Sequence, residues 1–506
     1  MRFGILLAFA GVLFAQNNPA ARAARNWREA HERAIVQEFI ELLSIPNLAS
    51  DTSNIERNAA AISGLLEKRG VKTRLLRSGG VPPAVYGEIE TPGATRTLVF
   101  YAHYDGQPLD PKEWKTPPWQ PVLRDKPLDR DGKVIPLPEA GAHFDPESRI
   151  YARSASDDKA PIIAILAALD ALRASNMPLG SNIKLFFEGE EEAGSLHLDR
   201  ILTANKDLLR SDVWLICDGP VDQSRRQQIV FGARGVETVD ITLYGPRREL
   251  HSGHYGNWAP NPAMMLARLL ASMKDDDGRV LVDHFYDGIQ PLSETEKRAV
   301  AEAPDNGGNL KRELWLGRTD GAGKTLVELL NAPSLNVRGM ASSRIGSQTS
   351  NVIPATATAC IDMRLVKGID HDQAAARLTD HIRKQGYFIV DHDPDPDTLL
   401  SHPKVAKVVK RDGGYNAERT SMDLPISQLV IRTAESVRGP GVNGVVKLPT
   451  MGGSAPLHMM SDILHVPTIT VPIANHDNSQ HSFNENIRIQ NLWDGIELMA
   501  AMLAMR

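Results

Sequence analysis

Histidine and carboxylate residues follow several apolar stretches of this sequence. His103 and Asp105 come at the end of the apolar segment 97–101, and residues two apart on a strand point to the same face. A carboxylate beside a histidine can hold one ring nitrogen and direct the other toward a metal ion. Taken alone, the pair is more typical of a surface hydrogen bond, so it indicates a metal site only together with other ligands.

An acidic cluster follows the apolar segment 182–188. Glu188, Glu190, Glu191 and Glu192 place four glutamates in five positions. These carboxylates repel one another, and neither helix nor strand propensity gives a reason to collect them there. A bound cation would relieve the repulsion, whereas a solvated acidic loop is the alternative for this cluster alone.

Three further segments carry ligand-type residues. Asp157 and Asp158 precede a predicted helix, where an N-cap would also explain an aspartate. Asp218 follows the apolar segment 213–217, and the segment 476–485 contains His481. In α/β sheets, ligands gather outside the carboxyl ends of the strands, so we expect these segments to converge. Oxygen and imidazole ligands without cysteine suit two divalent ions, zinc above all, with a hydroxide between them that attacks a carbonyl or phosphoryl centre.

The elements that must position these residues alternate between strand and helix. Apolar spacing predicts helices at 26–43, 55–68, 161–173, 262–273, 371–384, 429–437 and 487–505. It predicts strands at 71–76, 85–89, 97–101, 182–188, 213–217, 356–365, 387–390 and 466–471. This alternation is typical of an α/β fold with a mixed sheet. The segment 107–150 has no sustained helical or strand periodicity, which predicts a long surface loop.

The chain has 506 residues, 57 Lys and Arg against 62 Asp and Glu, and a formal net charge of −5. Its length requires at least two domains, and its acidity argues against nucleic-acid binding. Because the ligand-type residues lie on both sides of 236–423, we expect that segment to be a smaller α+β domain inserted into another domain. The catalytic domain would then comprise 25–235 and 424–506.

The N-terminal segment predicts export. Residues 3–14 are apolar behind Arg2, which is too short for a membrane span and typical of a signal peptide cleaved after Ala15. We expect a periplasmic or secreted protein, with an uncleaved anchor as the alternative. The two cysteines, Cys217 and Cys360, fall in different expected domains, which excludes a disulfide framework and favours buried core positions.

Six ordered motifs resemble the carnosinase, glutamate carboxypeptidase and aminoacylase family of dinuclear zinc hydrolases. They are Tyr101–Pro108, Ala152–Pro161, Glu188–Ser195, Leu250–Gly253, Gly452–Pro456 and His481–Glu485. The resemblance covers nearly the whole chain and implies a mixed-sheet catalytic domain with an inserted smaller lid domain. It also implies two Zn²⁺ per subunit, with Mn²⁺ or Co²⁺ as possible substitutes, and a homodimer formed through the inserted domain.

The same resemblance implies roles for individual residues. His103 and Asp218 would bind one zinc, Glu192 and His481 the other, and Asp157 would bridge both. Asp105 would orient His103. Glu191 would take the proton from the bridging water and hand it to the leaving amine. Members of the family also have a non-proline cis peptide after the bridging aspartate, here Asp157–Asp158.

The inserted domain would contribute to substrate binding. His251 would donate a hydrogen bond to the substrate carbonyl, and it could belong either to the same subunit as the metal site or to a partner subunit. Asn351 and Arg364 would hold the substrate carboxylate. Gly453 and Ser454 would contact the substrate terminus. As alternatives, Leu250–Gly253 is a simple turn and Arg364 a salt-bridged surface residue.

The resemblance has three departures. Ala152–Ser154 stands where the family usually has Gly-Arg-Gly before the bridging aspartate. Thr450 and Met451 stand where charged residues often precede Gly-Gly-Ser. The segment 107–150 is longer than we expect for a simple dipeptidase.

We therefore expect a metallopeptidase that hydrolyses short peptides in the manner of a dipeptidase or carboxypeptidase. An N-acyl amino acid amidohydrolase using the same two metals is the alternative within this class. A peptide-binding protein without catalysis is disfavoured because Glu191 and all five expected ligands are present. A two-metal phosphatase is disfavoured because Arg364 is the only obvious anion clamp in the substrate region.

Overall fold

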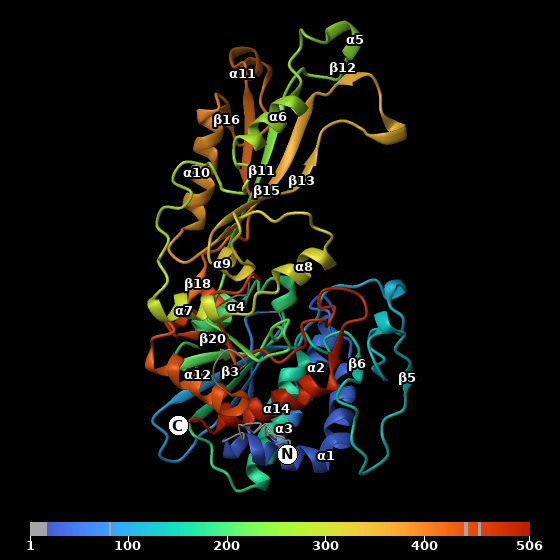
Figure 1. Cartoon of the computed structure of the whole chain (residues 1–506), viewed down its shortest axis with the longest axis vertical. Coiled ribbons are helices and arrows are strands. Elements are labelled where there is room, and N and C mark those ends of the chain that lie inside the picture. The colour runs from blue at the N-terminus through green and yellow to red at the C-terminus, as the bar shows by residue number, and fades with distance from the viewer. Residues whose placement is uncertain (1–17, 80–81, 440–443, 454–456) are drawn as a thin grey trace, which may run out of the picture. The chain divides into compact units, whose positions relative to one another are not determined.

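The computed structural model describes residues 18–79, 82–439, 444–453 and 457–506 (Figure 1). The expected signal peptide at 1–15 and the candidate substrate-binding residue Ser454 lie outside these residues. Within the described residues, no helix combines the length and the apolar character needed to cross a membrane. The chain divides into two compact units. The first comprises Met1–Ile229, Asp423–Val446 and Ile469–Arg506, and the second comprises Val230–Met422 and Lys447–Thr468.

The second unit is inserted between parts of the first, but its boundary differs from the expected 236–423. The segment Lys447–Thr468, which we expected in the catalytic part 424–506, belongs to the second unit. The backbone N–H of Met451 donates to Gly232 O at 2.9 Å, which joins this returning segment to the start of the insert. Such a pairing between distant segments leaves no pattern in the local sequence.

An eight-stranded mixed sheet supports the first unit. Its strand order is β1-β2-β7-β3-β8-β20-β9-β19. The bounds are β1 Lys72–Leu76, β2 Ala84–Ile89, β3 Thr97–His103, β7 Asn182–Glu188, β8 Val213–Ile216, β9 Gln228–Val230, β19 Val446–Leu448 and β20 Thr468–Thr470. Strand β3 runs parallel to both β7 and β8, so the carboxyl ends of these three strands lie at one edge. This edge is where the sequence predicted convergence.

The helices α1 (Pro19–Leu43), α3 (Lys159–Ala174) and α14 (Ile489–Leu503) pack against one another in the first unit (Figure 1). Helix α3 is buried along nearly its whole length, which explains its almost continuous apolar sequence. Helix α1 begins seven residues before the predicted start at 26, because Asn18 caps the backbone N–H groups of Ala20 and Ala21. The other helices of this unit are α2 Thr52–Glu67, α4 Leu198–Ala204 and α12 Pro425–Arg438.

The segment 107–150 contributes to a second sheet and is not a plain loop. Strands β4 (Val122–Arg124), β5 (Val134–Ile135) and β6 (Arg149–Tyr151) form a four-stranded sheet with β21 (Asn486–Arg488), in the order β21-β6-β4-β5. Two short 3₁₀ turns, Pro111–Glu113 and Leu128–Arg130, lie in the same segment. Because β6 pairs with a strand from the far end of the chain, the local sequence shows no periodicity that predicts this sheet.

The second unit has a five-stranded sheet in the order β13-β15-β11-β17-β16, in which only β16 and β17 are parallel. Along β11, buried and partly buried residues alternate, so one face carries Val239, Ile241 and Leu243 into a core with helices α6 and α10. The strands are β10 Gly232–Ala233, β11 Gly235–Tyr244, β12 Leu250–His251, β13 Ser334–Ala341, β14 Val352–Ile353, β15 Thr356–Leu365, β16 Phe388–Val390, β17 Val405–Lys410 and β18 Glu418–Arg419. The helices are α5 Ser252–Tyr255, α6 Pro262–Ala271, α7 Glu294–Glu302, α8 Gly307–Glu313, α9 Leu326–Leu330, α10 His371–Lys384, α11 Pro396–Ser401 and α13 Leu457–Leu464. This separate, smaller sheet domain agrees with the expected α+β insert.

Candidate metal centre

The carboxyl edge of the large sheet brings together the residues that the sequence singled out. His103 is the last residue of β3, and its register partner on β7 is Glu188. Glu191 and Glu192 lie on a short 3₁₀ turn just after β7, and Asp218 lies two residues after β8. Parallel pairing of β3 with both neighbours places these ends side by side. The convergence expected from the sequence is therefore present.

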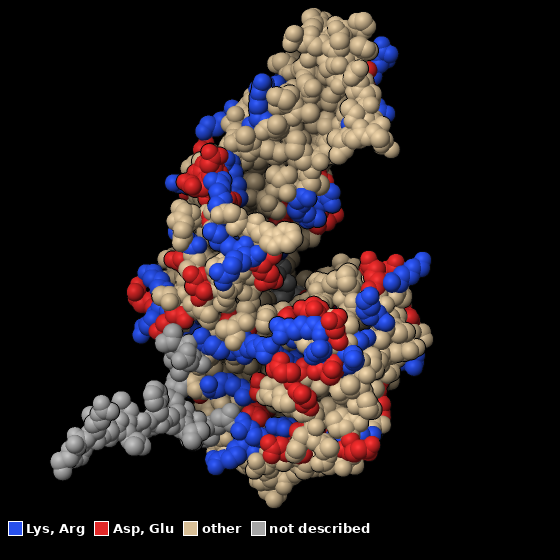
Figure 2. Space-filling model, turned by 45° about the vertical axis from the view of Figure 1, so that its right-hand side comes forward, with Lys and Arg blue, Asp and Glu red and all other residues tan. Residues whose placement is uncertain are grey.

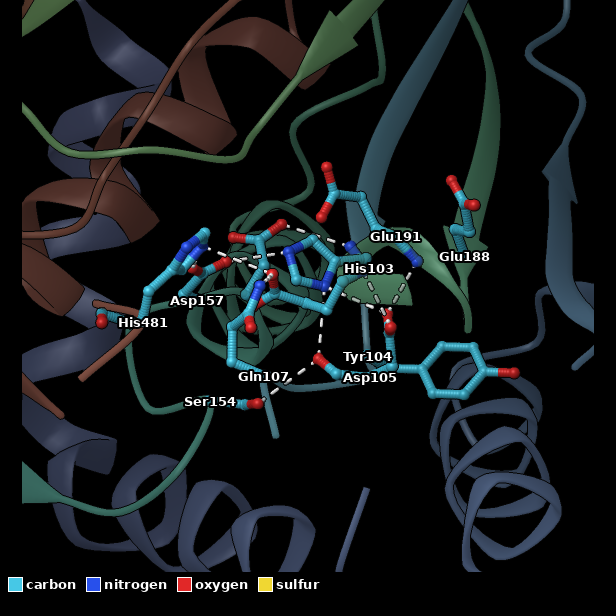
Figure 3. Close-up of polar contacts among 12 residues, drawn as sticks. His103, Tyr104, Asp105, Gln107, Ser154, Asp157, Glu188, Glu191 and His481 are labelled. Carbon is cyan, nitrogen blue, oxygen red and sulfur yellow. Dashed lines mark hydrogen bonds and ion pairs between the residues drawn. The ribbon is translucent and has the colours of Figure 1, made fainter. Parts of the chain in front are cut away.

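Asp157 lies between two imidazoles. Its Oδ1 is 2.8 Å from Nε2 of His103, and its Oδ2 is 3.2 Å from Nε2 of His481 (Figure 3). The Asp157 side chain is only 5 % exposed. Since each carboxylate oxygen faces a different histidine, this geometry is that of a carboxylate able to bridge two cations.

Glu192 and Asp218 lie on either side of this arrangement. Oε2 of Glu192 is 3.3 Å from Nε2 of His481 and accepts a hydrogen bond of 2.6 Å from Nε2 of Gln107. Ligand atoms of His103, Asp157 and Glu192 lie within 4.8 Å of one another, which makes these three residues a candidate metal site. Ligand atoms of His103, Asp158 and Asp218 form a second such group. All five expected ligands therefore lie in one cluster.

The cluster has carboxylate oxygens for which the protein supplies no donor. Among the described residues, Oδ1 of Asp158 and Oδ1 of Asp218 are buried without a hydrogen-bond partner. An unpaired buried carboxylate is costly, and a divalent cation would supply the missing partner. Carboxylate oxygens and imidazole nitrogens are ligands that zinc and similar divalent ions accept. The residues present therefore fit a divalent metal centre.

The burial and crowding of these carboxylates also shift their pKa values. Burial, followed by the charge of Asp157, raises the pKa of Glu192 and of Asp218. Burial opposes ionisation of Asp157 as well, but its contacts with His103 and His481 hold its pKa well below the usual range. The two histidines thus stabilise the charge of Asp157 more than that of Glu192 or Asp218. A bound cation would stabilise the charges of all three carboxylates.

Asp105 contacts both His103 and the 3₁₀ turn after β7. Its Oδ1 is 3.3 Å from Nδ1 of His103, which agrees with the expected orienting contact. The same carboxylate accepts hydrogen bonds from the backbone N–H groups of Glu191 and Glu192, at 3.1 and 3.0 Å. Sequence reasoning anticipated the first contact but not the other two.

Glu191 is held by its backbone and leaves its carboxylate available. In Figure 3 the carboxylate points away from Asp105. Among the described residues it makes no hydrogen bond or ion pair, and burial together with nearby carboxylates raises its pKa. A carboxylate of raised pKa without a structural partner is suited to proton transfer.

Sequence reasoning missed three residues of this centre. Asp158 is fully buried and accepts a hydrogen bond from the His103 backbone N–H at 3.2 Å, whereas the sequence had indicated for it only a helix N-cap and the cis peptide. Gln107 contacts Glu192, and Glu485 is fully buried behind the cluster. All three residues lay within the quoted motifs, which was the only signal in the sequence for their part in the centre. The expected cis peptide at Asp157–Asp158 is confirmed.

The expected substrate-binding residues lie in the second unit. His251 and Asn351 are neighbours there, since β12 pairs with β14 and the Ser252 N–H donates to Asn351 O at 2.9 Å. Arg364 lies near the opposite end of β15, with its Nε 3.2 Å from Oδ2 of Asp362. Gly453 is exposed.

The cysteines take no part in the metal cluster. Cys217 and Cys360 are free, as expected, but only Cys217 is fully buried, whereas Cys360 on β15 is partly exposed. Burial raises the pKa of the Cys217 thiol well above its usual value, so this cysteine is not a nucleophile at neutral pH.

Comparison with known proteins supports this interpretation of the cluster. Residues 99–505 match the model of peptidase family M20/M25/M40. The chain is 27% identical to the human Beta-Ala-His dipeptidase over 83% of its own length and 77% of that protein. It is 26% identical to the Cys-Gly metallodipeptidase DUG1 of Saccharomyces cerevisiae, over 84% of its own length and 82% of that protein.

The fold comparison agrees. The crystal structure of the M20 family metallo-carboxypeptidase Sso-CP2 from Sulfolobus solfataricus superposes with a TM-score of 0.73 at 28% identity, covering 93% of this chain and 98% of that chain. Human carnosine dipeptidase 1 superposes with a TM-score of 0.67 at 22% identity, covering 96% of this chain and 99% of that chain, which shows the shared fold. With a buried carboxylate and histidine cluster at the sheet edge and a family match over most of its length, this chain belongs to peptidase family M20/M25/M40 and is a metallopeptidase.

Proposed function

We propose that this metallopeptidase hydrolyses amide bonds in short peptides, as a dipeptidase or carboxypeptidase, with two Zn²⁺ ions for which Mn²⁺ or Co²⁺ can substitute. The observation that carries the proposal is Asp157, whose two oxygens face the separate imidazoles of His103 and His481. A single carboxylate placed in this way is what a pair of ions requires. The relatives' names, Beta-Ala-His and Cys-Gly dipeptidase, support a short peptide as the substrate.

The five ligands divide between two ions. His103 and Asp218 would hold one ion, Glu192 and His481 the other, and Asp157 would bridge them. The bound ions would polarise the scissile carbonyl and lower the pKa of the attacking water.

The proton transfer belongs to Glu191. It would accept a proton from the attacking water and later deliver it to the leaving amine, so that its charge is restored at the end of each turnover. Asp105 would keep this glutamate in place through its backbone N–H. In this proposal the carboxylate of Glu191 transfers the proton, whereas the hydrogen-bonded carboxylate of Asp105 positions Glu191.

Substrate binding falls to the second unit in this proposal. His251 would stabilise the developing negative charge on the carbonyl oxygen, and Asn351 and Arg364 would bind the substrate carboxylate. On β15, Arg364 and Thr356 are eight residues apart, roughly 26 Å at about 3.3 Å per residue, and Asn351 lies beyond Thr356. One short peptide does not span that distance, so His251 and Asn351 would act on the substrate of a partner subunit. Gly453 and Ser454 would contact the substrate terminus.

A homodimer formed through the second unit follows from this division. The end of that unit which carries α5 and β12 shows few charged side chains (Figure 2). There Trp258 is 80% exposed and Met264 is 56% exposed. Surfaces that another protein covers are enriched in aromatic residues and methionine and depleted of charge at their centre. Sedimentation of the purified chain should give the mass of a dimer, and a monomer would contradict this part of the proposal.

We also propose export through cleavage after Ala15, on the basis of the apolar N-terminal segment. N-terminal sequencing of protein purified from cell fractions tests it. Mature protein beginning at Gln16 outside the cytoplasm is the expected result, and full-length protein in the cytoplasm would contradict it.

Substrate assays with the purified, metal-loaded chain test the function. We expect turnover of dipeptides to exceed that of N-acetyl amino acids, and the reverse order would favour the N-acyl amino acid amidohydrolase. A phosphomonoester serves as a control that should not be hydrolysed.

The Glu191→Ala variant tests whether the chain is an enzyme and not a peptide-binding protein. It should lose about 10²–10⁴-fold in kcat while it keeps its bound metal. Glu190→Ala is the matched control, because Glu190 is a neighbouring carboxylate that pairs with His197 and should be dispensable for turnover. Equal activity of wild type and Glu191→Ala would overturn the assignment of Glu191.

A further inference from the structure

Glu485 is a fully buried carboxylate that makes an unusual number of hydrogen bonds. Its Oε1 accepts from the Ser156 N–H at 2.9 Å, from Ser156 Oγ at 3.0 Å and from the Asp157 N–H at 3.0 Å. Its Oε2 accepts from Nη1 of Arg153 at 2.8 Å and from the Ser154 N–H at 2.9 Å. One side chain therefore gathers the donors of the segment that leads into Asp157.

These donors form a concave anion site. Successive backbone N–H groups that turn toward one point bind an anion well, and here the anion is a side chain of the same protein. Ser154 adopts the left-handed conformation with φ 61°, which lets the segment curve around the carboxylate. Because the acceptor is ionised, these hydrogen bonds are stronger than those between neutral groups.

Further hydrogen bonds join the segment before Asp157 to the segment that contains His481. Arg153 donates from Nη2 to Ser482 O at 3.3 Å, and the Ala152 N–H donates to Glu485 O at 3.1 Å. The segment 152–157 and the segment 481–485 are therefore joined through both main chain and side chain.

The segment around His481 has little regular structure of its own to fix it. His481 and Asn484 both have φ 60°, a conformation that is uncommon for residues with a side chain. The His481 side chain is 54% exposed, whereas that of His103 is fully buried at the end of β3. Contacts from outside the segment must hold His481 in place.

We propose that Glu485 is a positioning residue that sets the relative placement of His481 and Asp157, and so controls occupancy of the metal site to which His481 contributes. The inference rests on the proposed two-metal function. His103 ends β3 and Asp218 follows β8, and neither contacts Glu485, so the ion that these two residues would hold depends on Glu485 only through the bridging Asp157. Loss of the carboxylate should weaken one metal site and leave the other close to normal.

The variant Glu485→Gln tests this with metal binding as the readout. A glutamine keeps the shape but replaces one accepting oxygen with an NH₂ group that faces donors. Titration of the metal-free chain with Co²⁺, followed by its absorption spectrum, and with Zn²⁺, followed by calorimetry, should show a first ion bound as in the wild type. The second ion should bind about 10–100-fold more weakly, and excess metal should restore kcat.

Glu497→Gln is the matched control. Glu497 is also buried in the first unit and pairs with Arg25 at 2.7 Å, but it lies on α14 and contacts none of the expected ligands. This variant should lower the Tm and keep both metal affinities. If Glu485→Gln proves insoluble, Glu485→Asp keeps the charge, withdraws the carboxylate by one methylene, and should show the same selective loss to a smaller degree.

Two results would overturn the inference. One is a Glu485 variant that binds both ions as tightly as the wild type, and the other is an equal loss of both ions together with the Tm. A wild-type chain that binds fewer than two ions would instead overturn the two-metal function itself, which separates the two failures.

Discussion

The carboxylate of Asp105 accepts a hydrogen bond of 3.1 Å from the backbone N–H of Glu191. The same side chain faces Nδ1 of His103 and the N–H of Glu192. One carboxylate therefore aligns the candidate base and two candidate metal ligands. It does so without contacting the substrate, which makes it a positioning residue in our proposal.

Asp105→Asn should lower kcat by about 10–100-fold with little change in KM, since an amide keeps only one of the two accepting oxygens. Steady-state kinetics at saturating metal measures the effect. Asp51→Asn is the control, because Asp51 caps α2 in the same unit and asparagine caps a helix equally well. An Asp105→Asn variant with normal kcat would contradict the alignment role.

Removal of metal should destabilise the protein as well as stop turnover. Two buried carboxylate oxygens of the cluster, Oδ1 of Asp158 and Oδ1 of Asp218, have no donor among the described residues, so the metal-free state leaves them unpaired. An ion at about 100 times its Kd stabilises the folded state by about 2.7 kcal/mol. A chelator should therefore lower the Tm, and Zn²⁺ should restore it. A Tm that is indifferent to chelation would contradict the site.

Metal affinity should rise with pH. In the metal-free chain burial raises the pKa of both Glu192 and Asp218, so protons occupy these ligands at pH values where free carboxylates are ionised. Metal binding must displace those protons. Calorimetry in buffers of different ionisation enthalpy should detect proton release, with weaker binding at about pH 5.5 than at about pH 8. Affinity independent of pH would contradict this account.

Glu188 should make stability fall as the pH rises. It is only 3% exposed, and burial raises its pKa from 4.5 to about 7. The folded state therefore binds a proton that the unfolded state releases between about pH 4.5 and 7, so the stabilisation is complete below that window and lost above it. The free energy of unfolding that Glu188 contributes through this proton is at most about 3 kcal/mol.

Glu188→Gln isolates this effect. The Tm of the variant minus that of the wild type should be larger at about pH 8 than at about pH 5, because glutamine carries no charge at either pH. The Tyr101 hydroxyl, which donates to Oε2 of Glu188 at 2.6 Å, retains an acceptor in the variant. The same difference at both pH values would mean that Glu188 titrates normally.

Asn47 links the turn after α1 to two segments of the metal centre. It is fully buried, and its Nδ2 donates to Tyr104 O and to Ser154 Oγ, each at 2.8 Å. Asn47→Ala leaves these acceptors unpaired and should cost about 1–3 kcal/mol of stability, together with a loss of kcat. Asn205→Ala removes a single bond to Ile201 O in α4 and should leave kcat unchanged. Equal kcat for both variants would contradict the link.

The sequence by itself was sufficient for much of the site, because several ligands are fixed by local patterns. His103 ends a strand that its apolar residues predict, and Glu191, Glu192 and Asp218 follow two others. The parallel arrangement expected of an α/β sheet then brings those strand ends together. The motif resemblance supplied the roles of His481 and Asp157, and both lie in the cluster.

Only the tertiary structure decided how these ligands are supported. Glu485 and Ser154 are hydrogen-bonded across 331 positions of sequence, and β6 pairs with β21 from the opposite end of the chain. The burial of Asp158 likewise depends on what the rest of the chain packs around it. Periodicity and spacing report contacts within a few residues, whereas these contacts depend on the path of the whole chain. For that physical reason the sequence predicted the ligands of this metallopeptidase and the contact of Asp105 with His103, whereas only the fold revealed how Glu485 and Asp158 hold the other ligands.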